Sequence, residues 1–69
     1  MPIKLTINGQ EKDFPAALTL SDLVQQLGMK PERVAVELNR EIAPRDRWSV
    51  IELHDGDRLE IVHFVGGGI

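Results

Sequence analysis

Hydrophobic and polar residues alternate over the first seven positions, where every second side chain is apolar. These apolar side chains belong to Ile3, Leu5 and Ile7. A period of two is typical of a half-buried strand. Asn8 and Gly9 follow, and both residue types tolerate the positive φ angles of a tight hairpin turn. The pattern predicts a β-hairpin whose second strand runs from about residue 10 to a core-facing Phe14, before Pro15 ends it.

The period changes from strand-like to helical after Thr19. Apolar side chains at positions i, i+3, i+4 and i+7 share one helical face, and they are Leu20, Leu23, Val24 and Leu27. Thr19 or Ser21 can cap the first amides, and Asp22 suits the positive end of the helix. Gly28 can adopt the left-handed conformation that follows a helix. We expect a short amphipathic helix that needs a sheet to pack against.

A strand and a brief return strand are predicted after the helix. Residues 34–38 are mostly apolar and include two β-branched valines, a composition typical of strands. Asn39 and Arg40 can turn the chain into a short pairing at residues 41–42. Pro44 then ends this excursion, because it cannot donate to a strand ladder.

The remainder of the chain contains a crossover and a closing strand. Segment 45–48 is polar except for Trp48, so we expect a helical turn that buries the indole and anchors the crossover. The Asp-Gly dipeptide at 55–56 is a strong turn signal between two apolar stretches. The last predicted strand runs from residue 58 to about residue 65.

The predicted order is hairpin, helix, strand pair, irregular crossover and closing strand. Segregated elements of this kind fit a mixed sheet packed on one main helix. We therefore expect an α+β fold of the β-grasp, or ubiquitin-like, class. Residues 1–65 would form this domain, and residues 66–69 a flexible C-terminal glycine tail. A chain of 69 residues has room for one modest core and no second domain.

Composition and charge exclude several classes of function. The 11 acidic residues outnumber the 8 basic ones, whereas nucleic-acid binding requires a basic face. No apolar run approaches the roughly 20 residues that span a bilayer, and the N-terminus lacks a signal peptide's features, so we expect a cytoplasmic protein without membrane attachment. The chain has no cysteine, so it cannot carry sulfur on a thiol of its own.

Side chains that could catalyse a reaction or bind a metal are scarce. His54 and His63 lack the close spacing of a zinc motif and have no cysteines to complete one. Asp55 and Asp57 flank a glycine, but a strand is predicted where a calcium-binding loop would have to continue. We expect these residues to form a turn, and we expect neither a metal site nor an enzyme activity of the chain's own.

Three consecutive glycines follow the last predicted strand, at Gly66, Gly67 and Gly68. They do not match a phosphate-binding loop, because neither a helix nor a Lys-Ser or Lys-Thr pair follows them. Two interpretations remain open on these residues alone. The glycines are either a frayed end of the domain, or a thread without side chains that enters a narrow tunnel and presents a carboxylate to another protein.

Several segments of the chain carry a family resemblance. In the last third they are APRDRW at 43–48, LHDGD at 53–57 and EIVHFVGGG at 60–68. Together they resemble the thiamine-biosynthesis sulfur carriers of the ThiS family. The upstream segments ING at 7–9, TLSDLV at 19–24 and VAVELN at 34–39 fit the same family. The resemblance therefore covers nearly the whole chain.

The resemblance implies a sulfur carrier and not an enzyme. It implies that the carboxylate of Gly68 is adenylated by a ThiF-type enzyme with Mg-ATP, converted to a thiocarboxylate with a persulfide sulfur donor, and used by thiazole synthase. Gly66 and Gly67 would form the flexible lead to that residue. Phe64 and Val65 are candidate docking residues, with packing as their alternative role. No cofactor is expected on this chain, since Mg-ATP and the persulfide belong to its partners.

Two alternatives to this carrier remain. The small subunit of molybdopterin synthase shares the fold and the Gly-Gly end but donates sulfur to a pterin precursor. Segments 44–48 and 62–65 favour the thiamine branch over it. A non-covalent ubiquitin-like interaction module is the second alternative, and it would undergo no change with a ThiF-type enzyme and Mg-ATP.

The sequence continues one residue past the last glycine, to Ile69. The family's free carboxylate belongs to the glycine, and a β-branched side chain would fill the space that a glycine path leaves. The chain that ends at Ile69 is therefore expected to be an inactive precursor or an altered form. Either a protease removes Ile69 before sulfur is loaded or the adenylating enzyme tolerates the isoleucine, and the side chain disfavours the second alternative. With removal, the intact mass of the cellular protein should correspond to a chain ending at Gly68. Retention of Ile69 alongside full thiazole-forming activity would contradict this expectation.

Overall fold

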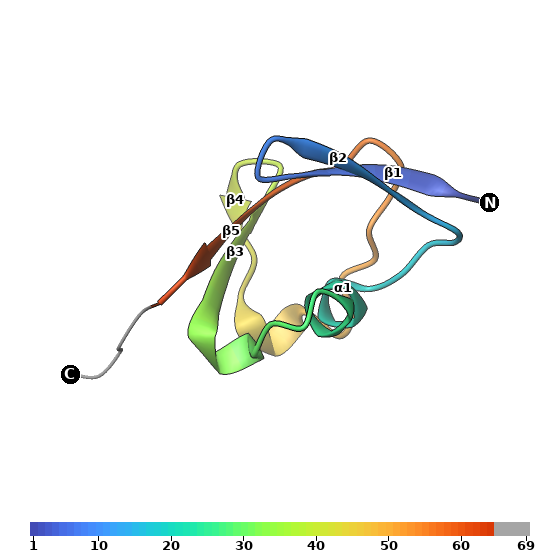
Figure 1. The fold of residues 1–69 in the computed structure, drawn as a ribbon. Helices are drawn as coiled ribbons and strands as arrows, with labels where there is room; N and C mark the ends of the chain where they lie inside the picture. Colours follow the sequence, from blue (N-terminus) through green and yellow to red (C-terminus); the bar gives the residue numbers. More distant parts are fainter. Residues whose placement is uncertain (65–69) are drawn as a thin grey trace.

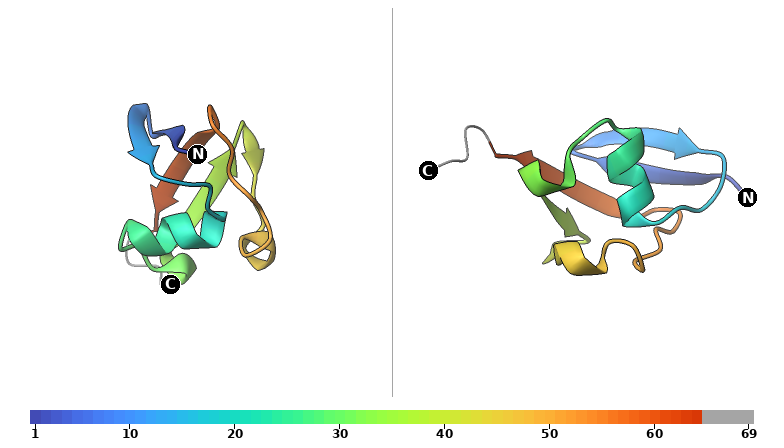
Figure 2. Two further views of the ribbon diagram at one scale, coloured as in Figure 1. Left: turned by 90° about the vertical axis from the view of Figure 1, so that its right-hand side faces the viewer. Right: turned by 90° about the horizontal axis from the view of Figure 1, so that it is seen from below.

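The computed structural model describes residues 1–64, which form a mixed sheet with a helix against one face (Figures 1 and 2). Over this range the sheet has five strands in the order β2-β1-β5-β3-β4. Strands β1 and β5 are parallel, and the other neighbours are antiparallel. The elements are β1 (Ile3–Ile7), β2 (Gln10–Phe14), α1 (Leu20–Gln26), η1 (Pro31–Arg33), β3 (Val34–Leu38), β4 (Glu41–Ile42), η2 (Arg45–Arg47) and β5 (Arg58–His63). The predicted α+β arrangement is confirmed.

The N-terminal hairpin forms as the alternation predicts. The inward side chains of β1 are buried, and β1 pairs with β2 along its whole length, ending with Ile7 opposite Gln10. Asn8 and Gly9 make the turn with φ angles of 50° and 82°. Phe14 is half-buried and packs against the core, as predicted, while the rest of β2 is exposed. The hairpin thus gives the sheet a polar outer edge.

Helix α1 covers the core with its apolar face. Thr19, and not Ser21, is the cap: its side-chain oxygen accepts from the amide of Asp22 at 3.0 Å, and the Asp22 carboxylate accepts from the amide of Thr19 at 3.3 Å. Gly28 follows the helix with φ +74°, as predicted. The buried residues of the helix are Leu20, Leu23 and Val24. A helix of seven residues depends on this burial for its stability.

Trp48 anchors the crossover, as predicted, and is only 3% exposed. Its indole N–H donates to the carbonyl of Ala43 at 2.9 Å. The guanidinium of Arg45 lies 5.6 Å from the ring centroid and donates to the carbonyls of Pro31 and Val34 at 2.8 and 3.0 Å. These contacts tie η2 to the start of β3.

The last strand is shorter than the sequence indicates. β5 ends at His63, whose pairing with Val34 is the last of the β3–β5 ladder. The chain before Val34 forms η1, a 3₁₀ turn that the sequence did not predict, so β5 has no strand to pair with beyond this point. Phe64 retains one backbone bond, from its N–H to the carbonyl of Arg33 at 2.8 Å. The predicted extension was therefore too long at Phe64, and Val65 lies outside the described residues.

Truncation of the helix core should test the dependence of α1 on burial. Leu23 has no exposed surface and lies in the main core cluster, so Leu23→Ala should lower the free energy of unfolding by about 2–5 kcal/mol. Gln25→Ala changes an exposed residue of the same helix and should alter the free energy by less than about 0.5 kcal/mol. Urea unfolding of both variants measures the difference. Equal losses would contradict this account of the helix.

Candidate functional site

The strand that leads to the C-terminal glycines lies at the centre of the sheet, between β1 and β3. Its end points away from the N-terminus of the chain (Figure 1). Phe64, a predicted docking residue, is 47% exposed and follows this strand directly. The other predicted site residues, Val65, Gly66, Gly67 and Gly68, lie outside the described residues together with Ile69. Their roles, and the domain-to-tail boundary, stay predictions.

One asparagine clamps β5 from the hairpin side. The Asn8 side-chain oxygen accepts from the N–H of Ile61 at 2.7 Å, and its side-chain nitrogen donates to the carbonyl of Ile61 at 3.1 Å. The backbone N–H of Asn8 also donates to the carbonyl of Leu59 at 2.9 Å. The positive φ of Asn8 allows the hairpin turn. Its side-chain amide at the same time provides hydrogen-bond partners for the backbone N–H and carbonyl of Ile61, just beyond the last residue of β5 that pairs with β1.

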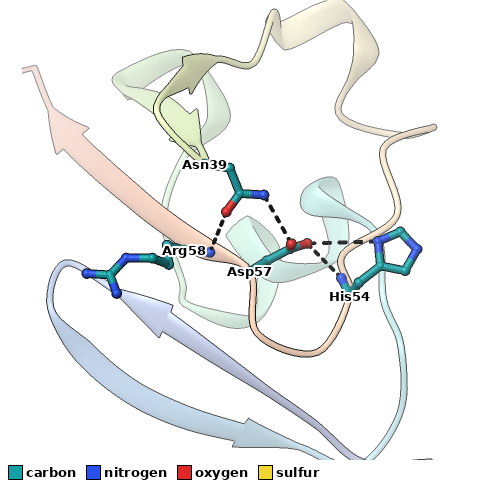
Figure 3. Close-up of polar contacts among 4 residues, drawn as sticks. All are labelled: Asn39, His54, Asp57 and Arg58. Carbon is teal, nitrogen blue, oxygen red and sulfur yellow. Dashed lines mark hydrogen bonds and ion pairs between the residues drawn. The ribbon is translucent and has the colours of Figure 1, made fainter.

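A second asparagine clamps β5 from the opposite side (Figure 3). The side-chain oxygen of Asn39 accepts from the N–H of Arg58 at 3.0 Å, and its nitrogen donates to the Asp57 carboxylate at 3.1 Å. The other oxygen of Asp57 accepts from the N–H of His54 at 2.7 Å. Asn39 also has a positive φ, of 51°. The sequence assigned Asn8 and Asn39 only to turns and gave no sign of these bonds to β5.

The turn before β5 is structural, as predicted. The Asp55 carboxylate accepts from the N–H of Lys4 at 2.7 Å, and the N–H of Gly56 donates to the carbonyl of Lys4 at 2.8 Å. Gly56 has φ +91°, which favours glycine. Within residues 1–64, no cluster of three or more His, Asp or Glu side chains could hold a metal ion. His63 is exposed on β5 and contributes to no such cluster there.

The outer face of the sheet, away from α1, carries an exposed apolar surface near the end of β5. Ile42 on β4 is 78% exposed and Val62 on β5 is 58% exposed. Both line a shallow groove of about 300 Å³ together with Ala35, Glu37 and Glu60. We call these five residues the sheet patch. The alternation in β5 could have placed Val62 outward, but a two-residue strand gave no periodicity from which to place Ile42.

Comparison with known proteins decides the family. The sequence model of the ThiS family matches residues 5–68. This chain belongs to the ThiS family. The sulfur carrier protein ThiS of Bacillus subtilis is 40% identical over 65 residues, which cover 93% of this chain and 98% of that protein. The crystal structure of the thiamine biosynthesis protein ThiS from Geobacter metallireducens aligns with a TM-score of 0.83 at 33% identity, covering 96% of this chain and 100% of that one.

Another relative places a ThiS-like segment in a larger protein. A thiazole synthase from Paramagnetospirillum magneticum is 47% identical over 66 residues, or 96% of this chain, but the match covers only 20% of that protein. Membership in the ThiS family and the alignment with a ThiS structure confirm the predicted family and the predicted β-grasp fold. In the described part of the chain, no helix is long and apolar enough to cross a membrane.

Substitutions of Asn8 should separate its two roles. Asn8→Gly keeps the freedom to adopt positive φ but loses both side-chain bonds to Ile61, so the free energy of unfolding should fall by about 1–3 kcal/mol. Asn8→Ala loses the bonds and also strains the turn, for a further loss of about 1 kcal/mol. Asn8→Asp retains an acceptor for the N–H of Ile61, so its free energy of unfolding should lie between those of wild type and Asn8→Gly. Chemical denaturation measures the free energy of unfolding of each variant. A value for Asn8→Gly equal to that of wild type would show that the Asn8 side-chain bonds to Ile61 do not stabilise the fold.

Proposed function

We propose that this chain carries sulfur as a thiocarboxylate on Gly68 and gives it to thiazole synthase for the thiazole of thiamine. The observation that carries the proposal is the position of β5, a central strand that is bonded on both sides as far as Ile61. On the β3 side the backbone bonds continue to Phe64, two residues before the first tail glycine. The close similarity to sulfur carriers named ThiS supports it. In this proposal, the fixed position of β5 determines where the glycines begin, and partner proteins reach Gly68 from there.

The chemistry of loading follows from the weakness of a carboxylate as an electrophile. In the proposed first step a carboxylate oxygen of Gly68 attacks the α-phosphorus of ATP, which yields an acyl adenylate and pyrophosphate. A persulfide sulfur of a partner then attacks the acyl carbon and displaces AMP. A second thiol of the partner breaks the sulfur–sulfur bond, leaving the thiocarboxylate on the carrier and a disulfide on the partner.

The groups that catalyse these steps belong to partner proteins in this proposal. The chain has no cysteine that could supply a persulfide, and residues 1–64 present no metal cluster for Mg-ATP. A ThiF-type adenylating enzyme would bind Mg-ATP and stabilise the charge that develops on the phosphates. We expect these encounters in the cytoplasm. The carrier contributes the acyl group and the surface by which it is recognised.

Thiazole synthase is the proposed acceptor of the sulfur. The thiazole synthase of P. magneticum includes a segment similar to 96% of this chain. Covalent linkage of two modules raises their effective concentration for each other, which suits modules that act together. This similarity favours the thiamine branch over the small subunit of molybdopterin synthase.

A loading assay tests the proposal directly. A chain ending at Gly68 is incubated with a ThiF-type enzyme, Mg-ATP and a persulfide donor, and its intact mass should rise by the difference between one sulfur and one oxygen. Without the persulfide donor, the acyl adenylate should be the product.

Two matched chains control this assay. A chain ending at Phe64 retains the described fold but lacks the glycines, and it should gain no mass. The chain ending at Ile69 should also stay unchanged until that residue is removed. An unchanged mass for the chain ending at Gly68, with an enzyme active on its own carrier, would favour a non-covalent interaction module instead.

A further inference from the structure

The residue that clamps β5 on the hairpin side is followed directly by a glycine. Asn8 and Gly9 form the turn between β1 and β2, and both residues are exposed to water. The side-chain amide of an asparagine is an electrophile for the backbone nitrogen of the next residue, and asparagine is one of the thermolabile residues of proteins. A glycine in the next position has no side chain to obstruct this approach. The dipeptide that suits the turn is therefore also open to attack on its own amide.

The reaction consumes one water molecule and releases one ammonia. The backbone nitrogen of Gly9 loses its proton to solvent and bonds to Cγ of Asn8, while the bond from Cγ to Nδ2 breaks and ammonia leaves. Water then opens the resulting cyclic imide. Opening at Cγ gives aspartate at position 8, and opening at the main-chain carbonyl gives isoaspartate, in which the backbone runs through the side chain. Nothing is oxidised or reduced in these steps.

The fold bonds both polar atoms of this amide to β5. Oδ1 of Asn8 accepts from the N–H of Ile61 at 2.7 Å, and Nδ2 donates to the carbonyl of Ile61 at 3.1 Å. The leaving nitrogen is therefore bonded in the folded chain, and ammonia cannot depart until that bond breaks. The backbone N–H of Asn8 also donates to the carbonyl of Leu59 at 2.9 Å, which holds the turn against the same strand. Cyclisation requires that this arrangement opens first.

One bond of the clamp acts in the opposite sense. The N–H of Ile61 donates to the oxygen that becomes negative when the nitrogen of Gly9 attacks, so it would stabilise the developing charge. An amide held at both polar atoms, however, is not free to turn toward the attacking nitrogen. Correct orientation of the reacting atoms contributes more to a rate than one such donor does. The net effect of the clamp on Asn8 is therefore protection.

The products of the reaction cannot restore the clamp. Aspartate keeps an acceptor for the N–H of Ile61 but places a carboxylate oxygen against the Ile61 carbonyl, where the amide nitrogen donated. Isoaspartate also lengthens the backbone of the turn, so Ile7 and Gln10 no longer meet in register. On its other side, β5 keeps the bond from the N–H of Arg58 to Asn39. Conversion of Asn8 therefore releases β5 on the β1 side alone.

We propose that Asn8 is a site of spontaneous deamidation, and that its bonds to Ile61 protect the amide for as long as the hairpin stays closed. The modification needs no enzyme, and it marks chains whose turn has opened. Asn39 also has a positive φ and also bonds β5 through its amide, but Arg40 follows it and carries a side chain that obstructs cyclisation. The modification therefore affects one of the two clamps and spares the other.

Incubation of the full chain in mildly alkaline buffer tests the site and its protection. Peptide mapping by mass spectrometry follows the replacement of NH2 by OH at position 8, and enzymatic methylation identifies isoaspartate. A synthetic peptide of residues 6–11 lacks the clamp, so its Asn8 should deamidate at least about tenfold faster than Asn8 of the folded chain. The full chain unfolded in guanidinium chloride should match the peptide. Asn39 is the internal control and should keep its amide in both full-chain samples.

Two results of this comparison would contradict the proposal. Equal rates at Asn8 in the folded chain and in the peptide would overturn the protection by the clamp. An unmodified Asn8 in both the peptide and the unfolded chain would overturn the site itself. None of these measurements depends on sulfur loading, so their outcome is independent of the proposed function.

Hydrogen exchange measures the effect of the modification on β5. The deamidated chain is separated from the fresh chain by its additional negative charge. The N–H of Ile61 should then exchange at least about tenfold faster than in the fresh chain, because its partner amide is lost. The N–H of Arg58 is the matched control, since Asn39 still accepts from it, and its exchange should stay the same. Unchanged exchange at Ile61 would overturn the release of β5.

Discussion

The structure depends on the hydrogen bonding of one strand, β5, along both of its sides. It pairs with β1 in parallel and with β3 in antiparallel orientation, and the side chains of Asn8 and Asn39 bond its backbone at Ile61 and Arg58. A register shift would break bonds on both sides at once and move Leu59 and Ile61 out of the core. The end of β5 is therefore held in a fixed position in the sheet.

This constraint is compatible with the proposed role of the chain as a sulfur carrier. Many of the described residues form a small buried core or bond to β5. Among these residues there is no cluster of three or more side chains that could hold a metal ion. In the proposed function, partner proteins supply the chemistry of sulfur loading.

The sequence predicted most of the fold because most of the elements are local. The hairpin followed from alternation and an Asn-Gly turn, and α1 from four apolar residues and a capping threonine. The end of β5 and the 3₁₀ turn η1 were missed, since the length of a strand depends on where its partner stops, and that partner is more than twenty residues away in the chain. Of the predicted site, Phe64 lies exposed after β5, whereas the contributions of Ile42 and Glu37 required the register of three strands.

The amino-acid sequence by itself determined the local elements, the lack of a thiol, and the run of glycines that carries the family resemblance. These properties follow from residue types and short periodicities, which need no knowledge of distant segments. Only the tertiary structure decided that Asn8 binds Ile61 across 53 residues and that Glu37 and Glu60 lie opposite each other in the β3–β5 ladder. Such contacts arise from strand order and register, and the packing of the whole core fixes both.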